Sequence, residues 1–577
     1  MNNSISLFNM FQNLWKNIEN KRRRKLFFII ALSILVSLFE VVTIGSVIPY
    51  FGILMNPEVL YSHNIAQPFI EILNIKYPKD LLFPVTIFFC FVVTVATISR
   101  IILIWLQTKT GHNIGADFSL KIYENALYKS YDKFLLINSS KIISGISQKT
   151  TNSVYNVIFP IINFASSIII LFSISIILFF INFKITVGII IIFIFVYSLV
   201  LILTRKKMKN YSLIADVETN FAIKKLQEGL GSIRDILIGN FQSQYIKNFE
   251  KSDLRLRKAL ASIQILTYSP KFIVELIFIF LISITAYYLA IMPEGIMRYF
   301  PIFITYVVAG QRMLPHFQSI YNNISLVKSG KDTLLSVLDL VNSGNDKIIG
   351  SKDLKIIFFR KEIIFKNVFF SYEQKSVINN INLTIQKGSK IGIVGATGNG
   401  KSTFLDLLMG LLMPTKGKIM IDDKVLLREN LLLWQKNISH VPQNIFLSDA
   451  SVSENIAFGI PYQSINLSLV EESAKIANLN KVINSWPDKY NTSIGEKGMQ
   501  ISGGERQRVG IARAMYRKSQ ILVLDEATNA LDTKTELEII NSIFKFNSNL
   551  TIFIVSHRRE ILKDCDTIIE FYNGSIL

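Results

Sequence analysis

Six long apolar runs in the first 330 residues constrain the fold of this chain more than any other feature. They cover approximately residues 26–55, 81–106, 158–181, 185–203, 265–291 and 299–324. Runs of this length cross a bilayer as helices, because backbone groups in hydrocarbon must form their hydrogen bonds within the segment. Half of the 577 residues are apolar and 42 are phenylalanines. The sequence therefore predicts an α-helical membrane domain with six spans over residues 1–330.

Basic clusters beside these runs predict how the chain is oriented. Residues 21–25 read KRRRK directly before the first run, and a second cluster covers residues 205–209 after the fourth. Lys and Arg concentrate in cytoplasmic loops, so we expect both termini in the cytoplasm and the chain in the cell inner membrane. These loops also explain the net charge of +20, so no nucleic-acid partner is expected. The two cysteines, Cys90 and Cys565, are expected to be packing residues.

Two polar stretches of around fifty residues, 107–154 and 210–264, separate neighbouring apolar runs. Both contain few helix breakers. About 25 helical residues rise nearly 40 Å, so these stretches are expected to carry the helices well below the bilayer. Residues 56–80 are expected to form an external loop, with a short helix near residues 67–73 on the membrane surface. A linker at residues 331–353 and a second domain at residues 354–577 complete the predicted organisation.

Five charged residues fall inside the predicted spans: Glu40, Arg100, Lys271, Glu275 and Arg312. Each would cost about 2.5–3.5 kcal/mol at a helix centre facing lipid, so we expect them to face a cavity or one another. For Arg100 and Lys271, near cytoplasmic helix ends, the alternative is a side chain that snorkels to the interface. Inward-facing cations would suit an anionic head group such as a phosphate or pyrophosphate. These five residues are therefore the candidates for a substrate cavity.

Residues 395–403 read GATGNGKST, which fits the phosphate-loop pattern G-x-x-x-x-G-K-[ST]. Glycines let backbone N–H groups point at phosphate oxygens. Lys401 is placed to reach the β- and γ-phosphates, and the Ser402 hydroxyl to ligate Mg²⁺. The preceding residues 390–394, KIGIV, are typical of a buried parallel strand. Strand, loop and helix together predict a nucleotide site.

A pair of carboxylates downstream predicts the hydrolytic groups. Residues 521–526 read ILVLDE, so Asp525 is expected to hold Mg²⁺ and Glu526 to orient or deprotonate the attacking water. The alternative, an ordinary buried strand end, is disfavoured by its position about 120 residues after the glycine loop. Gln443 follows a strand-like segment and is expected to touch Mg²⁺ or the water.

Two further motifs belong to the same part of the chain. Residues 551–557, TIFIVSH, are another buried strand, which would bring His557 to the sheet edge where nucleotide sites collect. A structural role is the alternative for this histidine. Residues 501–508 read ISGGERQR, in which Ser502 and two glycines open a helix and offer a hydroxyl and N–H groups to a second anion.

These motifs give the chain a resemblance to ATP-binding cassette (ABC) exporters in their half-transporter form. The resemblance covers nearly the whole length: six spans with long intracellular helices, the type IV exporter fold, then an α/β P-loop nucleotide-binding domain. GATGNGKST matches the Walker A motif, VPQN the glutamine loop, ISGGERQR the signature, ILVLDE the Walker B motif and NALD the D-loop. His557 matches the switch histidine and Tyr372 the aromatic that stacks on adenine. The signature departs from LSGGQ at Ile501 and Glu505.

The resemblance implies an ATPase coupled to transport, working as a dimer in which each signature motif closes on ATP held by the partner's Walker A loop. A homodimer is expected, with a heterodimer as the alternative. Coupling helices are implied near residues 131–139 and 236–245, pressing beside Gln443 and residues 495–500. The implied catalytic residues are Glu526, His557 and Gln443; those for Mg²⁺ are Ser402, Gln443 and Asp525; and those for ATP are Tyr372, Gly395, Ala396, Thr397, Gly398, Asn399, Gly400, Lys401, Ser402, Thr403, Ser502, Gly503, Gly504 and Asp532.

Within the exporters, the membrane half most resembles flippases of lipid-linked oligosaccharides. The similar segments are SLFEVVTIGSVIPYF around Glu40, the external loop, Arg100, SPKFIVE at residues 269–275 and QRMLP at residues 311–315. The flippase pattern has a further basic residue about two turns after Arg312, where this chain has Ser319. The leading hypothesis is ATP-driven flipping or export of an amphipathic lipid-linked oligosaccharide or polysaccharide precursor.

Two other functions are weighed against this hypothesis. A lipid or multidrug exporter would use the same ATP chemistry and an aromatic, charge-poor cavity. A nucleotide-gated channel or regulatory ATPase belongs to a different class, and the presence of Glu526 and His557 disfavours it because a gate that only binds ATP needs no base. A peptide exporter with a protease domain is not expected, since little sequence precedes Lys21.

Overall fold

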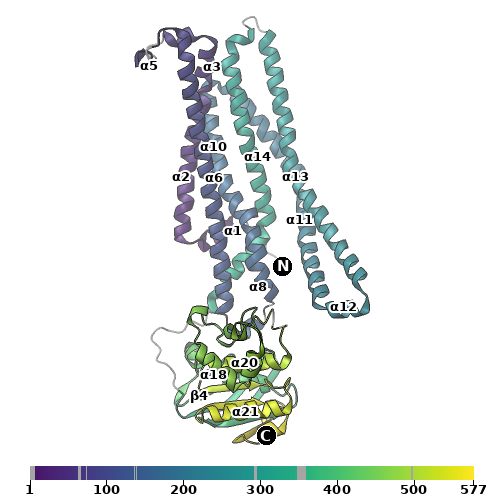
Figure 1. Cartoon of the computed structure of the whole chain (residues 1–577). Helices are drawn as coiled ribbons and strands as arrows, with labels where there is room; N and C mark the ends of the chain where they lie inside the picture. Colours follow the sequence, from purple (N-terminus) through teal and green to yellow (C-terminus); the bar gives the residue numbers. More distant parts are fainter. Residues whose placement is uncertain are drawn as a thin grey trace. The chain divides into compact units, whose positions relative to one another are not determined.

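The computed structural model describes residues 7–62, 67–72, 75–135, 137, 139–291, 295–346, 359–373, 375–495, 498 and 500–577. Contacts divide the chain into two compact units. The first contains Met1–Leu127 and Asn138–Gly344, and the second contains Tyr128–Ile137 and Asn345–Leu577. The first is built from long helices and the second from sheets covered by helices (Figure 1).

The long helices of the first unit extend well beyond the apolar runs. They are α2 (Asn20–Gly45), α3 (Val47–Met55), α6 (Leu82–Leu127), α10 (Phe159–Ile181), α11 (Phe183–Gly231), α13 (Gln242–Ile291) and α14 (Gly295–Asn342). The two polar stretches are therefore largely helical, as the scarcity of helix breakers predicts. Figure 1 shows α11 and α13 side by side, ending at the short α12 (Ile233–Gly239).

Shorter elements connect these helices. They are α1 (Leu7–Asn17), α4 (Pro57–Tyr61), α5 (Gln67–Ile72), η1 (Pro78–Leu81), α8 (Ser139–Ser144), η2 (Gly145–Lys149), α9 (Thr150–Ser153) and η3 (Val154–Ile158). Of these, α5 is the short helix expected in the external loop; the end of that prediction, residue 73, lies outside the described residues. The first predicted span is divided at Ser46 into α2 and α3.

Five stretches of the described chain are long and apolar enough to cross a membrane: Asn20–Met55, Pro78–Leu127, Lys141–Ile181, Phe183–Thr204 and Gln242–Ile291. Each of these stretches contains one of the first five predicted spans. The sixth predicted span lies in α14, a helix that packs on α10 and α13 in the same unit. Its hydropathy is lowered by polar side chains such as Arg312, His316 and Gln318. The sixth span therefore stays a prediction.

Hydroxyl and amide side chains join the helices inside this apolar bundle. The Ser33 hydroxyl lies 2.8 Å from the Ser166 hydroxyl, and the Gln107 amide donates to Ser166 at 2.7 Å. These contacts link α2, α6 and α10. Among described residues, Ser33, Gln107 and Ser166 are all buried. Interhelical hydrogen bonds of this kind hold helices together where burial of apolar surface gives little net attraction.

The strands of the second unit form two sheets. One has the order β2-β1-β4-β5 and the other the order β10-β9-β3-β8-β7-β6, in which neighbours from β9 to β6 are parallel. Their bounds are β1 (Glu362–Tyr372), β2 (Lys375–Gln386), β3 (Lys390–Gly395), β4 (Lys416–Ile421), β5 (Lys424–Val425), β6 (Ile438–Val441), β7 (Ile521–Asp525), β8 (Thr551–Val555), β9 (Thr567–Tyr572) and β10 (Ser575–Ile576). Almost every residue of β7 and β8 is buried, as in strands covered on both faces.

Helices pack on this parallel sheet or on one another. The longer ones are α15 (Lys401–Leu408), α18 (Leu467–Ile476), α20 (Gly503–Tyr516) and α21 (Thr533–Phe546). Shorter ones are α16 (Leu431–Gln435), α17 (Val452–Ile456) and α19 (Asn480–Ser485). One apolar core lies around Phe365, Phe404 and Trp434, and a second lies beneath α20 and α21.

The ends of the two units differ from the predicted boundaries. Residues 331–342, predicted as linker, continue α14, and Leu334, Val337 and Leu338 are buried in the core of the first unit. The chain from Tyr128 to Ile137 belongs to the second unit. It contains α7 (Tyr131–Leu135), and Tyr131 packs against the core around Phe365. The sequence alone assigns residues 331–342 to the linker and residues 128–137 to the membrane domain, because those are their neighbours in the chain.

Phe404 tests the packing of the second unit. It is fully buried, and its ring lies 4.9 Å from that of Phe365 and 5.2 Å from that of Phe571. We expect Phe404→Ala to lower the free energy of unfolding by about 3–5 kcal/mol, because it removes a large buried ring and leaves a cavity. Denaturant unfolding followed by Trp434 fluorescence measures this. Phe546→Ala, at a partly exposed ring, is the control, and equal losses in both variants would contradict the assignment.

Candidate functional site

The parallel sheet brings the predicted nucleotide-binding segments to one edge. The glycine loop follows β3, Gln443 follows β6, Asp525 ends β7 and His557 follows β8. These strands are neighbours in the order β3-β8-β7-β6, and Asp525 pairs with Val555. The carboxyl ends of parallel strands face the same edge, which is where ligands bind in open α/β sheets. Segments separated by more than 150 residues are thereby brought together.

Backbone geometry explains why glycines are needed in the loop after β3. Gly395 has φ of 143°, and a Cβ there would lie 2.5 Å from the carbonyl oxygen of Phe571. Gly400 has φ of 98° and caps the start of α15. The buried Lys401 Nζ donates to the carbonyl oxygens of Gly395 and Ala396 at 2.6 and 3.1 Å. The lysine is therefore folded over a loop whose shape only glycine permits at these two points.

A hydroxyl and a carboxylate suited to a divalent cation meet beside this loop. Ser402, in the first turn of α15, forms a hydrogen bond with Asp525 at the end of β7. Burial and the neighbouring Glu526 raise the pKa of Asp525, whereas the Ser402 hydrogen bond and the Lys401 charge oppose that rise. Oxygen ligands of this type are those that Mg²⁺ prefers. The two side chains expected from separate motifs to hold Mg²⁺ are thus adjacent.

Three side chains converge on the carboxylate of Glu526. The Gln443 amide donates to Oε2 at 2.8 Å, the Asn529 amide donates to Oε2 at 2.9 Å, and His557 Nε2 lies 3.1 Å from Oε1. Glu526 has φ of 49°, a left-handed conformation that a non-glycine residue adopts at a cost. The surrounding contacts hold it there. The structure therefore brings together the three side chains expected to be catalytic, and adds Asn529.

An ion pair with one fully buried partner lies next to the histidine in the chain. Glu536 on α21 is fully buried, and its carboxylate accepts hydrogen bonds from the Thr528 hydroxyl and, at 2.5 Å, from Arg558 Nη1. Arg558 directly follows His557 in the chain. Removing one partner of a buried pair leaves an uncompensated charge, so this pair ties α21 to the segment that carries the histidine. Sequence reasoning missed it, because Glu536 and Arg558 read as ordinary surface charges.

The start of α20 explains the unusual residue at position 505. Ser502 is the N-cap: its hydroxyl accepts from the Glu505 backbone N–H at 3.2 Å, and the Glu505 carboxylate accepts from the Ser502 N–H at 2.7 Å. This reciprocal pair is a capping box, which either Glu or Gln can close. Glu505, where the LSGGQ pattern has Gln, therefore still closes the capping box at the start of α20. Gln507 on the same helix accepts from the Ala530 N–H at 2.9 Å, which joins α20 to the D-loop.

Two other residues expected to bind ATP have local partners. Tyr372 ends β1, its ring packs 4.8 Å from Phe370, and it forms a hydrogen bond with Thr403 of α15. Burial raises the pKa of its hydroxyl. It thus lies beside the start of α15. Asp532 caps α21 by accepting from the Thr535 N–H at 2.9 Å, so its visible role is structural.

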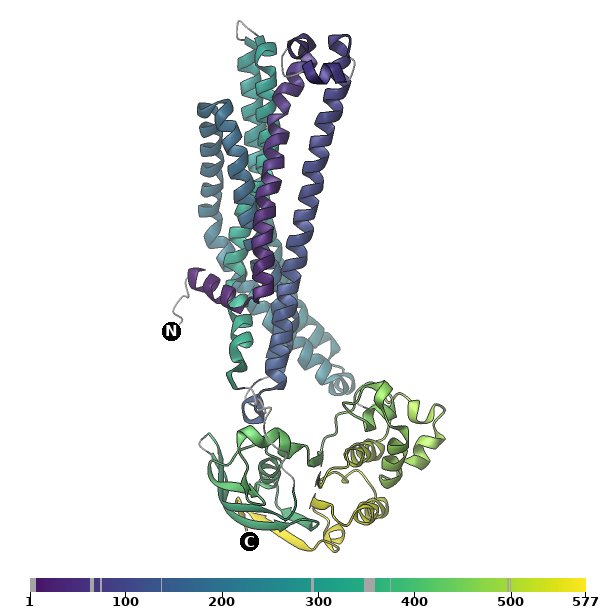
Figure 2. The same cartoon turned by 90° about the vertical axis from the view of Figure 1, so that its left-hand side faces the viewer.

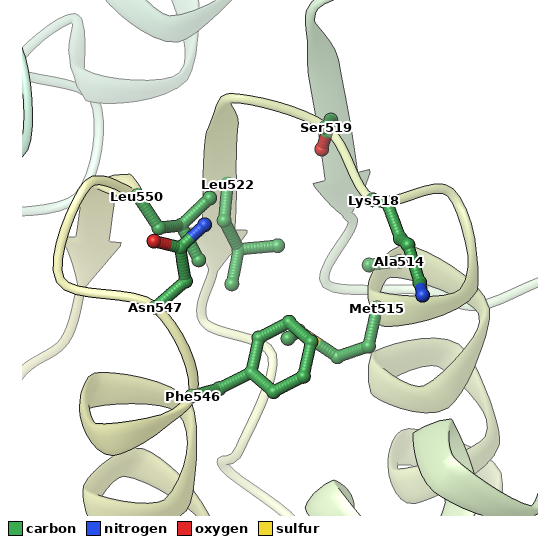
Figure 3. Close-up of a pocket in the computed structure, with 8 residues that line it drawn as sticks. All are labelled: Ala514, Met515, Lys518, Ser519, Leu522, Phe546, Asn547 and Leu550. Carbon is green, nitrogen blue, oxygen red and sulfur yellow. The ribbon is translucent and has the colours of Figure 1, made fainter. Parts of the chain in front are cut away.

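The described residues form an open cleft along this edge. It has a volume of about 620 Å³ and is lined by the segment after Gln443, the start of α20, Glu526 and the D-loop. A smaller pocket of about 190 Å³ lies elsewhere, between the end of α20, the start of β7 and the end of α21. Figure 3 shows the Phe546 ring on one side of this pocket and Lys518 and Ser519 on the other. That pocket is at the amino ends of the strands, so it is not part of the nucleotide site.

In the first unit, three of the five charged residues meet. Glu40 on α2 is fully buried and forms ion pairs with Arg100 of α6 and, at 3.6 Å, with Arg312 of α14. The arginines are partly exposed. The Arg100 side chain therefore reaches a partner within the bundle, and the alternative of a side chain that snorkels to a helix end does not describe it. His316, which sequence reasoning did not select, follows Arg312 by one turn.

The other two charged residues do not join this group. Lys271 and Glu275 lie on the exposed face of α13, and in the described part of the chain neither forms an ion pair with Glu40, Arg100 or Arg312. Ser319 occupies the position where the flippase pattern is basic. It accepts hydrogen bonds from the Ser167 hydroxyl at 3.0 Å and from the Asn323 amide at 3.1 Å, so it joins α10 to α14.

The segments implied to be coupling helices contain short helices whose bounds differ from the predicted ones. The first is α7 (Tyr131–Leu135), which is shorter than predicted and ends before residue 139, the start of α8. Tyr131 lies near Tyr372 and Asp406, and burial raises the pKa of its hydroxyl. The second is α12, which ends at Gly239 because Asn240 adopts a left-handed conformation, so Tyr245 falls in α13. Residues 496, 497 and 499, within the predicted groove segment, lie outside the described residues.

Glu505 offers a test of the helix cap. We expect Glu505→Ala to destabilise the start of α20 by about 1 kcal/mol, because the Ser502 N–H loses its acceptor. Glu505→Gln keeps an acceptor and is the matched control, with stability near that of the wild type. Thermal unfolding with and without nucleotide measures both. Identical unfolding of the Ala and Gln variants would mean that the box contributes nothing.

Comparisons with known proteins agree with this geometry. Residues 378–529 match the family described as ABC transporter. The chain is 29% identical over 375 residues to an ATP-dependent lipid A-core flippase of Syntrophus aciditrophicus, covering 64% of this chain and 62% of that protein. It is 29% identical over 486 residues to the multidrug resistance-like ATP-binding protein MdlA of Buchnera aphidicola, covering 81% of this chain and 80% of the relative.

A solved structure shares the fold over almost the whole chain. It is a bacterial Atm1-family ABC exporter with ATP bound, with a TM-score of 0.74, 19% sequence identity, and coverage of 97% of this chain and 95% of that one. The expected fold class, a helical membrane part followed by an α/β nucleotide-binding domain, is confirmed. The family match also agrees with the expected ATP site, since residues 378–529 contain the glycine loop, Gln443 and Glu526. The chain thus carries an ABC transporter ATPase domain joined to helices that have the fold of an ABC exporter.

Proposed function

We propose that this protein hydrolyses ATP to flip or export an amphipathic substrate with an anionic head group, most simply a lipid-linked oligosaccharide or polysaccharide precursor. The observation that carries the proposal is the Glu40–Arg100–Arg312 cluster inside the helical bundle. The contacts that converge on Glu526 support the other part of the proposal, the hydrolysis of ATP. Both halves belong to one chain, as expected of a half-transporter in the cell inner membrane.

The hydrolytic chemistry follows from the contacts of Glu526. Its carboxylate is placed to orient a water and accept its proton as the water attacks the γ-phosphorus and the bond to the β–γ bridging oxygen breaks. Gln443 and His557 hold that carboxylate from two sides. Lys401 can exchange its loop carbonyls for phosphate oxygens, because its stem is long and flexible. ADP and inorganic phosphate are the products.

Mg²⁺ fits the residues present. Ser402 and Asp525 offer adjacent oxygen atoms, and Gln443 lies next to Glu526 within the same edge. When bound, the ion would neutralise charge on the β- and γ-phosphates.

A dimer is part of this proposal. Ser502, Gly503 and Gly504 present the N-terminus of α20, whose first N–H groups suit a phosphate, yet this chain already has a separate glycine loop for its own ATP. Two copies would pair each loop with the partner's α20. A homodimer is the simplest form, since this chain contains both halves of the shared site.

The charge cluster favours an anionic substrate. Two arginines share one carboxylate, which leaves one positive charge in excess among these three groups. An uncompensated charge within a membrane is costly and is retained where it serves a pathway. A phosphate or pyrophosphate oxygen can replace Glu40 as the partner of either arginine, because guanidinium binds carboxylate and phosphate with the same geometry. The excess charge therefore predicts the sign of the head group.

A lipid or multidrug exporter is the second candidate. It is supported by an apolar cavity of about 590 Å³ between α11, α13 and α14, lined by rings that include Phe278, Tyr288 and Tyr306. Such a cavity suits an uncharged or weakly charged amphiphile. A nucleotide-gated channel or regulatory ATPase is disfavoured, because Gln443, Asn529 and His557 all position the hydrolytic carboxylate.

Glu526→Gln tests the hydrolytic assignment. Because the amide cannot accept the water proton, we expect ATPase activity of the protein in lipid vesicles to fall by at least about 100-fold, with ATP binding retained. Glu560→Gln, on the exposed turn after His557, is the control and should keep activity within about twofold. Substantial hydrolysis by the Glu526→Gln protein would remove this residue from the reaction.

Arg312→Ala tests the substrate assignment. The variant keeps the neutral Arg100–Glu40 pair, so folding should survive, but the excess positive charge is lost. We expect flipping of a polyprenyl-pyrophosphate glycan in vesicles to fall by about tenfold or more, with basal ATPase activity retained. Lys271→Ala, on the exposed face of α13, is the control. Normal glycan flipping by Arg312→Ala, or stimulation of ATPase only by uncharged amphiphilic drugs, would favour the multidrug alternative.

A further inference from the structure

We propose that a cavity between α2 and α6, at the end of the bundle that carries the N-terminal basic run, binds the anionic head group of a membrane phospholipid. The cavity has a volume of about 260 Å³. Three cations line it, Arg24 and Lys25 from α2 and Lys109 from α6. Phe28, Ile29 and Leu106 form its apolar part. This site goes beyond transport and requires only that the helices span a membrane.

In the basic run at residues 21–25, two arginines form hydrogen bonds within the protein. Arg22 is held by Asp117 of α6 through two hydrogen bonds of 2.7 and 2.9 Å. Arg23 donates to the backbone carbonyls of Ile18 and Lys16 at 2.9 and 3.1 Å, and its guanidinium lies over the Trp15 ring. These two arginines fix α2 to its neighbours. Arg22 is thus neutralised by a carboxylate, whereas Arg23 has its donors occupied by backbone carbonyls.

Arg24 and Lys25 are different. Both are exposed and line the cavity, as Lys109 does from the facing helix. Across the described ranges, no carboxylate forms an ion pair with any of these three side chains, and Lys109 lies only over the Trp105 ring, at 4.6 Å. Three like charges around one cavity repel one another. An anion between them would relieve that repulsion and bridge the two helices.

The position of the cavity along the helices matches the level of lipid phosphates. On one side of it the exposed surface is apolar and aromatic, with Phe27, Ile104 and Trp105 each more than half exposed. On the other side the chain becomes basic and polar. A basic ring directly beside an apolar belt is the arrangement found where a helix leaves the hydrocarbon layer. Basic pockets between membrane helices at this level bind anionic head groups.

The position of helix α1 is a second indication that lipid phosphates lie at the level of the cavity. Figure 2 shows it lying across the direction of the long helices beside the start of α2. Its residues Met10 and Leu14 are buried against the core of the bundle, whereas Phe8 and Trp15 are exposed. An amphipathic helix with exposed aromatic side chains lies in the interface between lipid and water. The adjoining cavity therefore faces the head groups of that leaflet.

The size and chemistry of the cavity specify the ligand. It is smaller than the sites of about 300–1,000 Å³ that enclose drug-sized ligands, so it would accept a phosphate with its adjoining glycerol, not a whole lipid. The acyl chains would then lie along Phe28 and the exposed apolar faces of α2 and α6. Lys109 follows Arg100 by nine residues, a rise of roughly 14 Å along α6, so this site is separate from the Glu40 cluster.

Trp105 supplies a local reporter for the test. The full-length protein carrying Trp15→Phe is placed in phosphatidylcholine vesicles that contain a small fraction of either phosphatidylglycerol or phosphatidylcholine with brominated acyl chains. Bromine quenches tryptophan fluorescence only at close range, and the other two remaining tryptophans, Trp434 and Trp486, lie in the second unit. We expect the brominated phosphatidylglycerol to quench Trp105 more strongly at equal mole fraction. Equal quenching by the two lipids would overturn the proposal.

Variants separate this cavity from diffuse surface charge. Each cation removed should lower the preference for phosphatidylglycerol by about fivefold, in Lys109→Gln and in Lys25→Gln. Lys109→Gln leaves the N-terminal run unchanged, so its insertion and orientation should be normal. Lys21→Gln, an exposed member of the run that does not line the cavity, is the control and should retain the full preference. Loss of preference in Lys21→Gln equal to that in Lys109→Gln would also overturn the proposal.

Discussion

A carboxylate removed from water must be given partners, and this requirement shapes both halves of the protein. Glu40 is fully buried among membrane helices and meets two arginines, while Glu536 is fully buried in the second unit and meets Arg558 and Thr528. Glu526 is held by an amide from each of two loops and by His557. Each carboxylate joins segments that are distant in the sequence, because a buried charge is tolerated only where its partners are fixed.

The same requirement relates the two proposed membrane sites. At the Glu40 cluster one carboxylate serves two arginines, so one positive charge remains for a substrate head group. At the cavity between α2 and α6, Arg24, Lys25 and Lys109 have no internal counter-charge among the described residues, whereas their neighbour Arg22 has Asp117. The cation that joins two helices thus has a carboxylate partner within the protein, whereas the cations that line the cavity are available to a ligand.

Much of the fold and of the nucleotide site could be predicted from the sequence. Apolar runs located the first five spans, and glycine spacing located the loop before Lys401, because both features depend on residues adjacent in the chain. The fold class followed from these together. The site beyond the loop was harder. Glu536 and Arg558 gave no local signal, since each acts through a partner in a different element.

The sequence by itself determined that membrane helices precede a phosphate-binding α/β domain, because hydrocarbon permits few backbone conformations and phosphate loops require glycine. Only the tertiary structure decided which charges are partners. Arg22 and Arg24 are two residues apart, yet one is neutralised by Asp117 and the other lines a cavity. Arg100 reaches Glu40, whereas Lys271 and Glu275 remain on an exposed face. Helix rotation and packing set these outcomes, and neither is encoded in a local motif.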